Sequence, residues 1–234
     1  MKQENYIRGM IMIILSAFFF ACMNVSVRLA GDLSSVQKSF FRNLVAAFFA
    51  AIILIKNHTA PKVEKTQWGS LFLRCAFGTL GILCNFYAID HLLVADASIL
   101  NKLSPFFAII FSFLLLKERI KPAQAMCVIL AFVGCLFVVK PGFENAHLIP
   151  ALIGVCGGLS AGIAYTMVRK MGTHGVKGPV IVFYFSCFSC IIVIPWIVFH
   201  YQPMSLRQLL TLLLAGLFAA GGQFTITAAY TYAP

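Results

Sequence analysis

The chain has 234 residues, of which 61% are hydrophobic and only 11% are charged. A soluble domain is about 45–50% apolar and about 25% charged, because it must cover its surface with polar side chains. Together with a mean hydropathy of +0.92, this composition excludes soluble enzymes, disordered chains and secreted disulfide scaffolds. The sequence therefore predicts an all-α integral membrane protein, a polytopic helical bundle.

The chain carries 18 Lys and Arg residues against 7 Asp and Glu, a formal net charge of +11. In a soluble protein this excess would suggest a nucleic-acid partner. Here the basic residues mostly lie in short gaps between apolar stretches, as the positive-inside rule requires. We therefore expect the lipid bilayer, and no nucleic acid, as a partner. The eight cysteines lie within apolar runs, where reduced thiols behave as small hydrophobic residues, so no metal and no cofactor is expected.

Eight apolar stretches are long enough to cross a bilayer, for which a helix needs about 20 residues. In chain order they cover 8–30, 36–56, 68–90, 94–116, 122–140, 147–168, 179–200 and 208–230. The second is the weakest, because Lys38 and Arg42 lie in its first turns.

Orientation follows from the distribution of Lys and Arg between the two sides. Of the 18 basic residues, twelve fall on the side of the N-terminus, Arg74 among them. The other six are Arg28, Lys38, Arg42, Lys102, Lys140 and Arg207. The bias predicts a cytoplasmic N-terminus in the cytoplasmic (inner) membrane.

Short similarities recur in the same order along the chain and indicate an internal repeat. Leu15-Ser16-Ala17 in the first span matches Leu159-Ser160-Ala161 in the sixth. A five-helix unit has an odd number of spans, so its second copy is inserted upside down. The predicted units are 8–140, with spans one to five, and 147–234, with spans six to eight. The second unit is then incomplete, so we expect a fragment, a truncated product or a chain that completes itself by association.

One stretch carries a family resemblance. It runs from Tyr87-Ala88-Ile89-Asp90-His91 through Ala95–Phe106, with Ser104-Pro105 inside, to Leu116-Lys117-Glu118-Arg119. It resembles the EamA-type ten-helix branch of the drug/metabolite transporter superfamily, although Lys117 stands where glycine is common. Phe41-Arg42 is also similar to a pair in that family. The resemblance implies transport of small metabolites or drugs, by exchange or coupled to an ion gradient, and two inverted five-helix repeats.

Lys102 is the strongest candidate for a functional residue, because it lies about 12 Å into the fourth span at 1.5 Å per residue. Pro105 cannot donate a hydrogen bond to the carbonyl of Asn101, which predicts a kink there. Ser98, Asn101 and Pro105 share one face of the helix, and transporters present backbone groups at such breaks. In the alternative, Lys102 extends to the outer interface and pairs with Asp96.

Further polar residues are expected to line the pathway. Those of the extracellular half would form an outward vestibule with Lys102, and they are Asn24, Arg42, Asn85 and Tyr87. The cations Arg42 and Lys102 would favour an anionic or zwitterionic solute there. Tyr165 and Gln223 lie nearer the cytoplasm and would form the inward half. The alternatives are interfacial anchoring for Arg42 and helix–helix hydrogen bonding for Asn24 and Asn85.

These observations predict a secondary transporter that moves a small polar metabolite or drug-like solute by alternating access. The sequence has no catalytic set or phosphate-binding loop, so an enzyme is not expected. The alternatives are an inactive truncated remnant and a proton-coupled multidrug exporter, whose carboxylate would be Asp90 or Asp96. Gly154, Gly158 and Gly162 predict a close helix contact, either within the bundle or in a homodimer.

Overall fold

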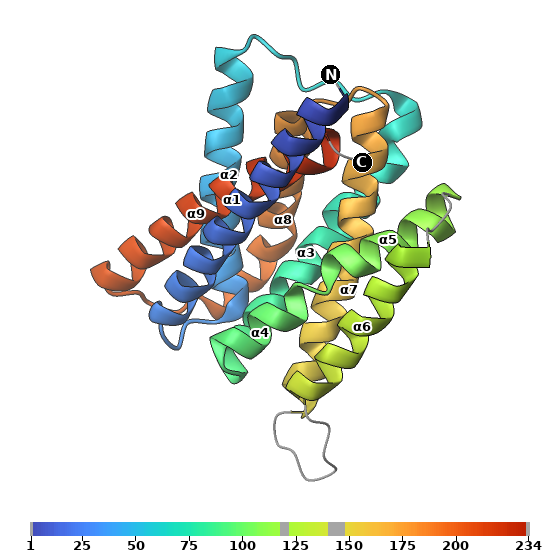
Figure 1. Ribbon diagram of the computed structural model, residues 1–234. Helices are drawn as coiled ribbons and strands as arrows, with labels where there is room; N and C mark the ends of the chain where they lie inside the picture. The colour runs from blue at the N-terminus through green and yellow to red at the C-terminus, as the bar shows by residue number, and fades with distance from the viewer. Residues whose placement is uncertain (1, 118–121, 140–147, 233–234) are drawn as a thin grey trace.

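The computed structural model describes residues 2–117, 122–139 and 148–232, and every regular element in these ranges is a helix (Figure 1). The predicted boundaries at 140 and 147, and positions 118 and 119 of the family motif, lie outside the described residues. The elements are α1 (Lys2–Leu29), α2 (Ser35–Lys56), the 3-10 turn η1 (Lys65–Gln67), α3 (Trp68–His91), α4 (Val94–Asn101), α5 (Ser104–Leu116), α6 (Pro122–Val139), α7 (Leu148–Thr173), α8 (Gly178–His200) and α9 (Leu206–Tyr232).

Within the described residues, seven helical segments are long and apolar enough to cross a bilayer, with α4 and α5 counted together as Val94–Leu116. The fifth predicted span corresponds to α6, where the apolar stretch is shorter and covers Ala125–Gly134. The all-helical, polytopic architecture predicted from the sequence is therefore confirmed.

The bundle has the polarity that a lipid environment requires. Large apolar side chains such as Ile14, Phe48 and Phe199 are exposed on its outside. Polar side chains such as Asn43 and Ser186 are fully buried inside it. Since hydrocarbon offers no partner to a polar group, these side chains must find their contacts within the bundle.

The long helices pack in three main pairs. Helix α1 lies along α9, α3 lies along α7, and α2 packs against α8, while α4 and α5 also pack on α7. Figure 1 shows α1 and α9 on one side and α4 to α7 on the other, with α1 beginning and α9 ending at the same end of the bundle. The interior between these pairs holds the polar side chains.

The glycine stripe on α7 lets the helix pair α4–α5 approach closely. A Cβ atom at Gly158 would lie 2.7 Å from the carbonyl oxygen of Leu100, and one at Gly162 would lie 2.5 Å from Cβ of Phe107. Both distances are too short for a carbon atom, so only glycine fits. Of the two uses predicted for this stripe, the structure shows packing within the bundle.

A buried ion pair joins α2 to the end of α3. The Lys38 ammonium is fully buried and donates a hydrogen bond to Asp90 Oδ1 at 2.5 Å, and the Ser35 hydroxyl donates to Asp90 Oδ2 at 2.8 Å. The Arg28 guanidinium donates to the backbone carbonyls of Ile89 and Asp90. We call Arg28, Ser35, Lys38 and Asp90 the Asp90 cluster. The sequence did not predict this ion pair, because Asp90 comes from a helix distant in sequence from Lys38.

Candidate functional site

A cavity of about 460 Å³ lies in the interior of the bundle, lined by residues from α1, α2, α3, α4, α5, α7, α8 and α9. Along α3 its lining runs from Arg74 to Phe86, roughly 18 Å at 1.5 Å per residue. The cavity therefore lies well inside the span and has the size of a small-molecule site.

Nine of the ten predicted pathway residues line this one cavity: Asn24, Arg42, Asn85, Ser98, Asn101, Lys102, Pro105, Tyr165 and Gln223. The tenth, Tyr87, is not among the lining residues, and its ring stacks on His91 with the centroids 4.0 Å apart. Asn85 and Tyr87 are two positions apart on α3, about 200° around the helix. If Asn85 faces the cavity, Tyr87 must therefore face away from it.

The predicted kink in the fourth span is present as a break between α4 and α5. The Lys102 amide caps α4 by donating to the Ser98 carbonyl at 3.1 Å, and the Leu103 carbonyl accepts from the amides of Phe106 and Phe107 at 3.0 Å. Pro105 occupies the first turn of α5, where its missing N–H costs no hydrogen bond. The chain changes direction at Lys102 and Leu103, and Lys102 leaves the helix at that point.

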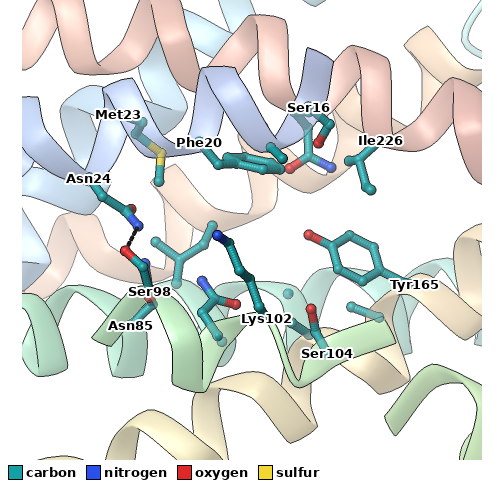
Figure 2. Close-up of a pocket in the computed structure, with 18 of the residues that line it drawn as sticks. Ser16, Phe20, Met23, Asn24, Asn85, Ser98, Lys102, Ser104, Tyr165 and Ile226 are labelled. Atoms are coloured by element: carbon teal, nitrogen blue, oxygen red, sulfur yellow. Dashed lines mark hydrogen bonds between the residues drawn. The ribbon is translucent and has the colours of Figure 1, made fainter. Parts of the chain in front are cut away.

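Figure 2 shows the Lys102 side chain extending from this break into the cavity towards Phe20 of α1. The alternative of a lysine extending to the outer interface is therefore not what the structure shows. The hydroxyl of Tyr165 also points into the cavity (Figure 2), while its ring stacks on Tyr230 with the centroids 5.2 Å apart.

Amide side chains supply further polar atoms. The Asn24 amide on α1 donates to the Ser98 hydroxyl on α4 at 3.0 Å, a contact drawn in Figure 2. One polar atom each of Asn24, Asn85 and Gln223 is buried without a hydrogen-bond partner in the described structure. An unpaired buried polar group costs about 1–3 kcal/mol, so these atoms are suited to bonds with a bound solute.

Arg42 is 3% exposed and lies deep in the bundle, which excludes the interfacial anchoring considered above. Its guanidinium donates to Asn43 Oδ1 at 2.7 Å and to Gln223 Oε1 on α9 at 3.3 Å. Its central carbon lies 5.8 Å from the ring centre of Phe185 on α8. All three partners are electrically neutral.

Arg74 is the lining residue that sequence reasoning missed. It was counted as a cytoplasmic flanking charge, but it is 2% exposed and its guanidinium carbon lies 3.9 Å from the ring centre of Phe185. A Cβ at Gly78 would collide with this guanidinium, so glycine one turn along α3 makes room for it. The same argument from depth that singled out Lys102 would have found Arg74 too, since Arg74 lies about six residues into the predicted third span, roughly 9 Å at 1.5 Å per residue.

A bundle of membrane-spanning helices around an interior polar cavity, with a broken helix at its wall, is the architecture of a solute transporter. The chain belongs to the EamA-like transporter family, whose profile matches residues 7–140. It is a membrane transport protein and not an enzyme, and the resemblance to the drug/metabolite transporter superfamily is confirmed.

Relatives of known name agree with this assignment. The chain is 32% identical over 229 residues to the pseudopaline exporter CntI of Pseudomonas aeruginosa, covering 96% of this chain and 78% of that protein. It is 24% identical over 230 residues to a riboflavin transporter of Brucella anthropi, covering 92% of this chain and 78% of that protein. A solved crystal structure, 14% identical in sequence, superposes with a TM-score of 0.70 over 97% of this chain and 78% of its own, which shows a shared fold.

Proposed function

We propose that this chain is a secondary transporter that binds a small polar solute in the interior cavity and moves it by alternating access. The observation that carries the proposal is that both predicted units contribute residues to the cavity lining. Arg42, Asn85 and Lys102 come from the first predicted unit (8–140), whereas Tyr165 and Gln223 come from the second (147–234). A relative movement of the two units would therefore rearrange the contacts around a bound solute.

The helix packing supports two related units. A two-fold relation that exchanges α1 with α7, α2 with α8 and α3 with α9 turns the α1–α9 contact into the α7–α3 contact. The same exchange turns the α2–α8 contact into itself. The α1–α9, α3–α7 and α2–α8 contacts are the three main pairs of long helices. Figure 1 shows α1 and α7 running in opposite directions along the bundle, as inverted copies must.

The proposed orientation places the N-terminus in the cytoplasm and the protein in the cytoplasmic membrane. Four cations of the original count, Lys38, Arg42, Arg74 and Lys102, are now explained by contacts inside the bundle or by the cavity. Leaving them out preserves the excess of Lys and Arg on the side of the N-terminus, because only Arg74 was counted on that side. Lys38, Arg42 and Lys102 were counted on the side with fewer basic residues. The Lys177 ammonium donates to Thr59 Oγ1 at 3.2 Å, so the connections after α2 and α7 lie on one side, as that topology requires.

Contacts at the opposite end support a gated pathway. The Asp90 cluster ties α1, α2 and α3 together there. The Gln37 amide on α2 also donates to the Gln202 carbonyl between α8 and α9 at 2.9 Å. These bonds close the proposed extracellular end, and in alternating access they would break and reform in each cycle.

The test needs no knowledge of the solute. Ala17 lines the cavity on α1 and is exposed, so Ala17→Cys in a chain with all eight cysteines replaced by alanine places one thiol in the pathway. A membrane-impermeant maleimide is applied to right-side-out and to inverted vesicles. Alternating access predicts labelling in both preparations.

Two exposed positions give the matched controls, Lys62 in the connection between α2 and η1 and Arg207 in the first turn of α9. Lys62→Cys should react only in inverted vesicles and Arg207→Cys only in right-side-out vesicles, which verifies sidedness and the proposed orientation. If Ala17→Cys reacts from one side only, or from neither, the alternating-access proposal is refuted.

A further inference from the structure

The cavity lining has an unbalanced charge. Arg42, Arg74 and Lys102 contribute three cations, and no Asp or Glu is among the lining residues of the described chain. A charged side chain within a membrane span costs about 2.5–3.5 kcal/mol on insertion scales. Such a cost is ordinarily offset by a paired charge, and this cavity contains none.

Arg42 and Arg74 are almost fully buried, so both of their charges are removed from water. Arg42 has only neutral acceptors, and Nε of both Arg42 and Arg74 has no hydrogen-bond partner within the described structure. An arginine carries five N–H donors in a planar fork. Both guanidinium groups therefore keep donor capacity at the cavity wall.

Phe185 brings the two guanidinium groups together. Its ring centre lies 3.9 Å from the guanidinium carbon of Arg74 and 5.8 Å from that of Arg42. A cation–π contact is worth about 0.5–2 kcal/mol, less than a desolvated charge-assisted pair. The ring thus holds two like charges close to each other at the cavity wall, where an anion could bridge them.

The remaining wall indicates what the rest of the ligand looks like. Phe20, Met23, Ile82 and Ile226 provide apolar surface, which suits a carbon skeleton. A bare inorganic anion would leave this surface unused. The guanidinium fork matches the two oxygens of a carboxylate, with two parallel N–H···O bonds.

We propose that the cavity recognises small organic carboxylates, with a carboxylate group bridging Arg42 and Arg74. The inference rests on the proposed transport function only in taking the bound carboxylate to be the transported solute. Binding itself can be measured without transport. Lys102 lies on the α4–α5 wall of the same cavity and provides the third cation, for solutes that carry another anionic group.

Thermal unfolding of the purified wild-type protein in detergent provides the first test, since a ligand that binds only the folded state raises its stability. The probes are acetate, benzoate, glutarate and 2-oxoglutarate, each compared with its neutral amide, and phenyl phosphate. We expect at least one carboxylate to raise the melting temperature while its amide does not. The inference is wrong if no carboxylate exceeds its amide, or if phenyl phosphate exceeds every carboxylate.

Variants then locate the site. Arg42→Gln and Arg74→Gln should each weaken binding of the stabilising carboxylate about 10- to 100-fold, the range expected for lost charge-assisted hydrogen bonds. Arg207→Gln, at an exposed position on α9, is the matched control and should bind normally. Equal binding by all three variants would overturn the assignment.

Gly78→Ala keeps the test decisive if an arginine variant does not fold. It retains both cations, but its Cβ would lie 2.7 Å from the Phe185 ring and would displace the Arg74 guanidinium. Carboxylate affinity should fall, and unchanged affinity would contradict the bridging geometry. If maleimide labelling occurs from both sides but no carboxylate binds, alternating access stands and this inference alone fails.

Discussion

The Asp90 cluster allows a quantitative prediction, because its two charges differ in burial. The Lys38 side chain is 0% exposed, whereas that of Asp90 is 19% exposed. Asp90→Asn leaves a fully buried ammonium without a counter-charge. Removing one partner of a buried ion pair costs about 3–5 kcal/mol, and we expect about 3 kcal/mol because the pair is partly solvated at its acidic end.

The reverse variant should cost less. Lys38→Met leaves a carboxylate that is partly exposed and still accepts a hydrogen bond from Ser35, so we expect about 1–2 kcal/mol. The double variant removes both charges and should return to within about 1 kcal/mol of the wild type. The cycle would then show a strong coupling between the two positions.

Thermal unfolding of the purified protein in detergent measures these differences. For a chain of this size a loss of about 3 kcal/mol corresponds to roughly 6–12 °C in melting temperature. Asp32→Asn, the same substitution at an exposed position of the α1–α2 connection, is the control and should change little. Equal losses for the two single variants that add up in the double variant would refute the reasoning, since the pair would then be uncoupled.

Three further outcomes follow from the packing and the cavity. Gly158→Ala places a Cβ 2.7 Å from the carbonyl oxygen of Leu100 and should destabilise the protein by about 1–3 kcal/mol. The control is Gly69→Ala, where nothing lies within 4 Å of the added Cβ, and equal melting temperatures of the two variants would contradict this. Lys102→Ala should weaken binding of a dicarboxylate in a titration, whereas Lys170→Ala, in the last turn of α7 and not among the cavity-lining residues, should not; unchanged affinity removes Lys102 from the site. Tyr87→Ala should leave ligand affinity unchanged, because its ring lies outside the cavity lining; a large loss would place it in the pathway.

The sequence by itself determined the features that depend on local chemistry. The length of the apolar runs predicts the membrane-spanning helices, since the bilayer sets the number of residues required. The break in the fourth span follows from Pro105, whose ring and missing N–H act on its own helix. The depth of Lys102 marked it as a residue that faces either the protein interior or the outer interface, and the structure places it at the cavity.

The tertiary structure decided the features that depend on which helices meet. Asp90 pairs with Lys38, 52 positions earlier in the chain, and no local pattern relates the two residues. Arg74 and Arg42 come from different helices and meet at Phe185 of a third. The glycine stripe on α7 predicts close contact, but only the fold shows that α4 and α5 occupy it. Periodicity tells which face of a helix is buried, whereas the identity of its neighbour depends on how all the helices pack together.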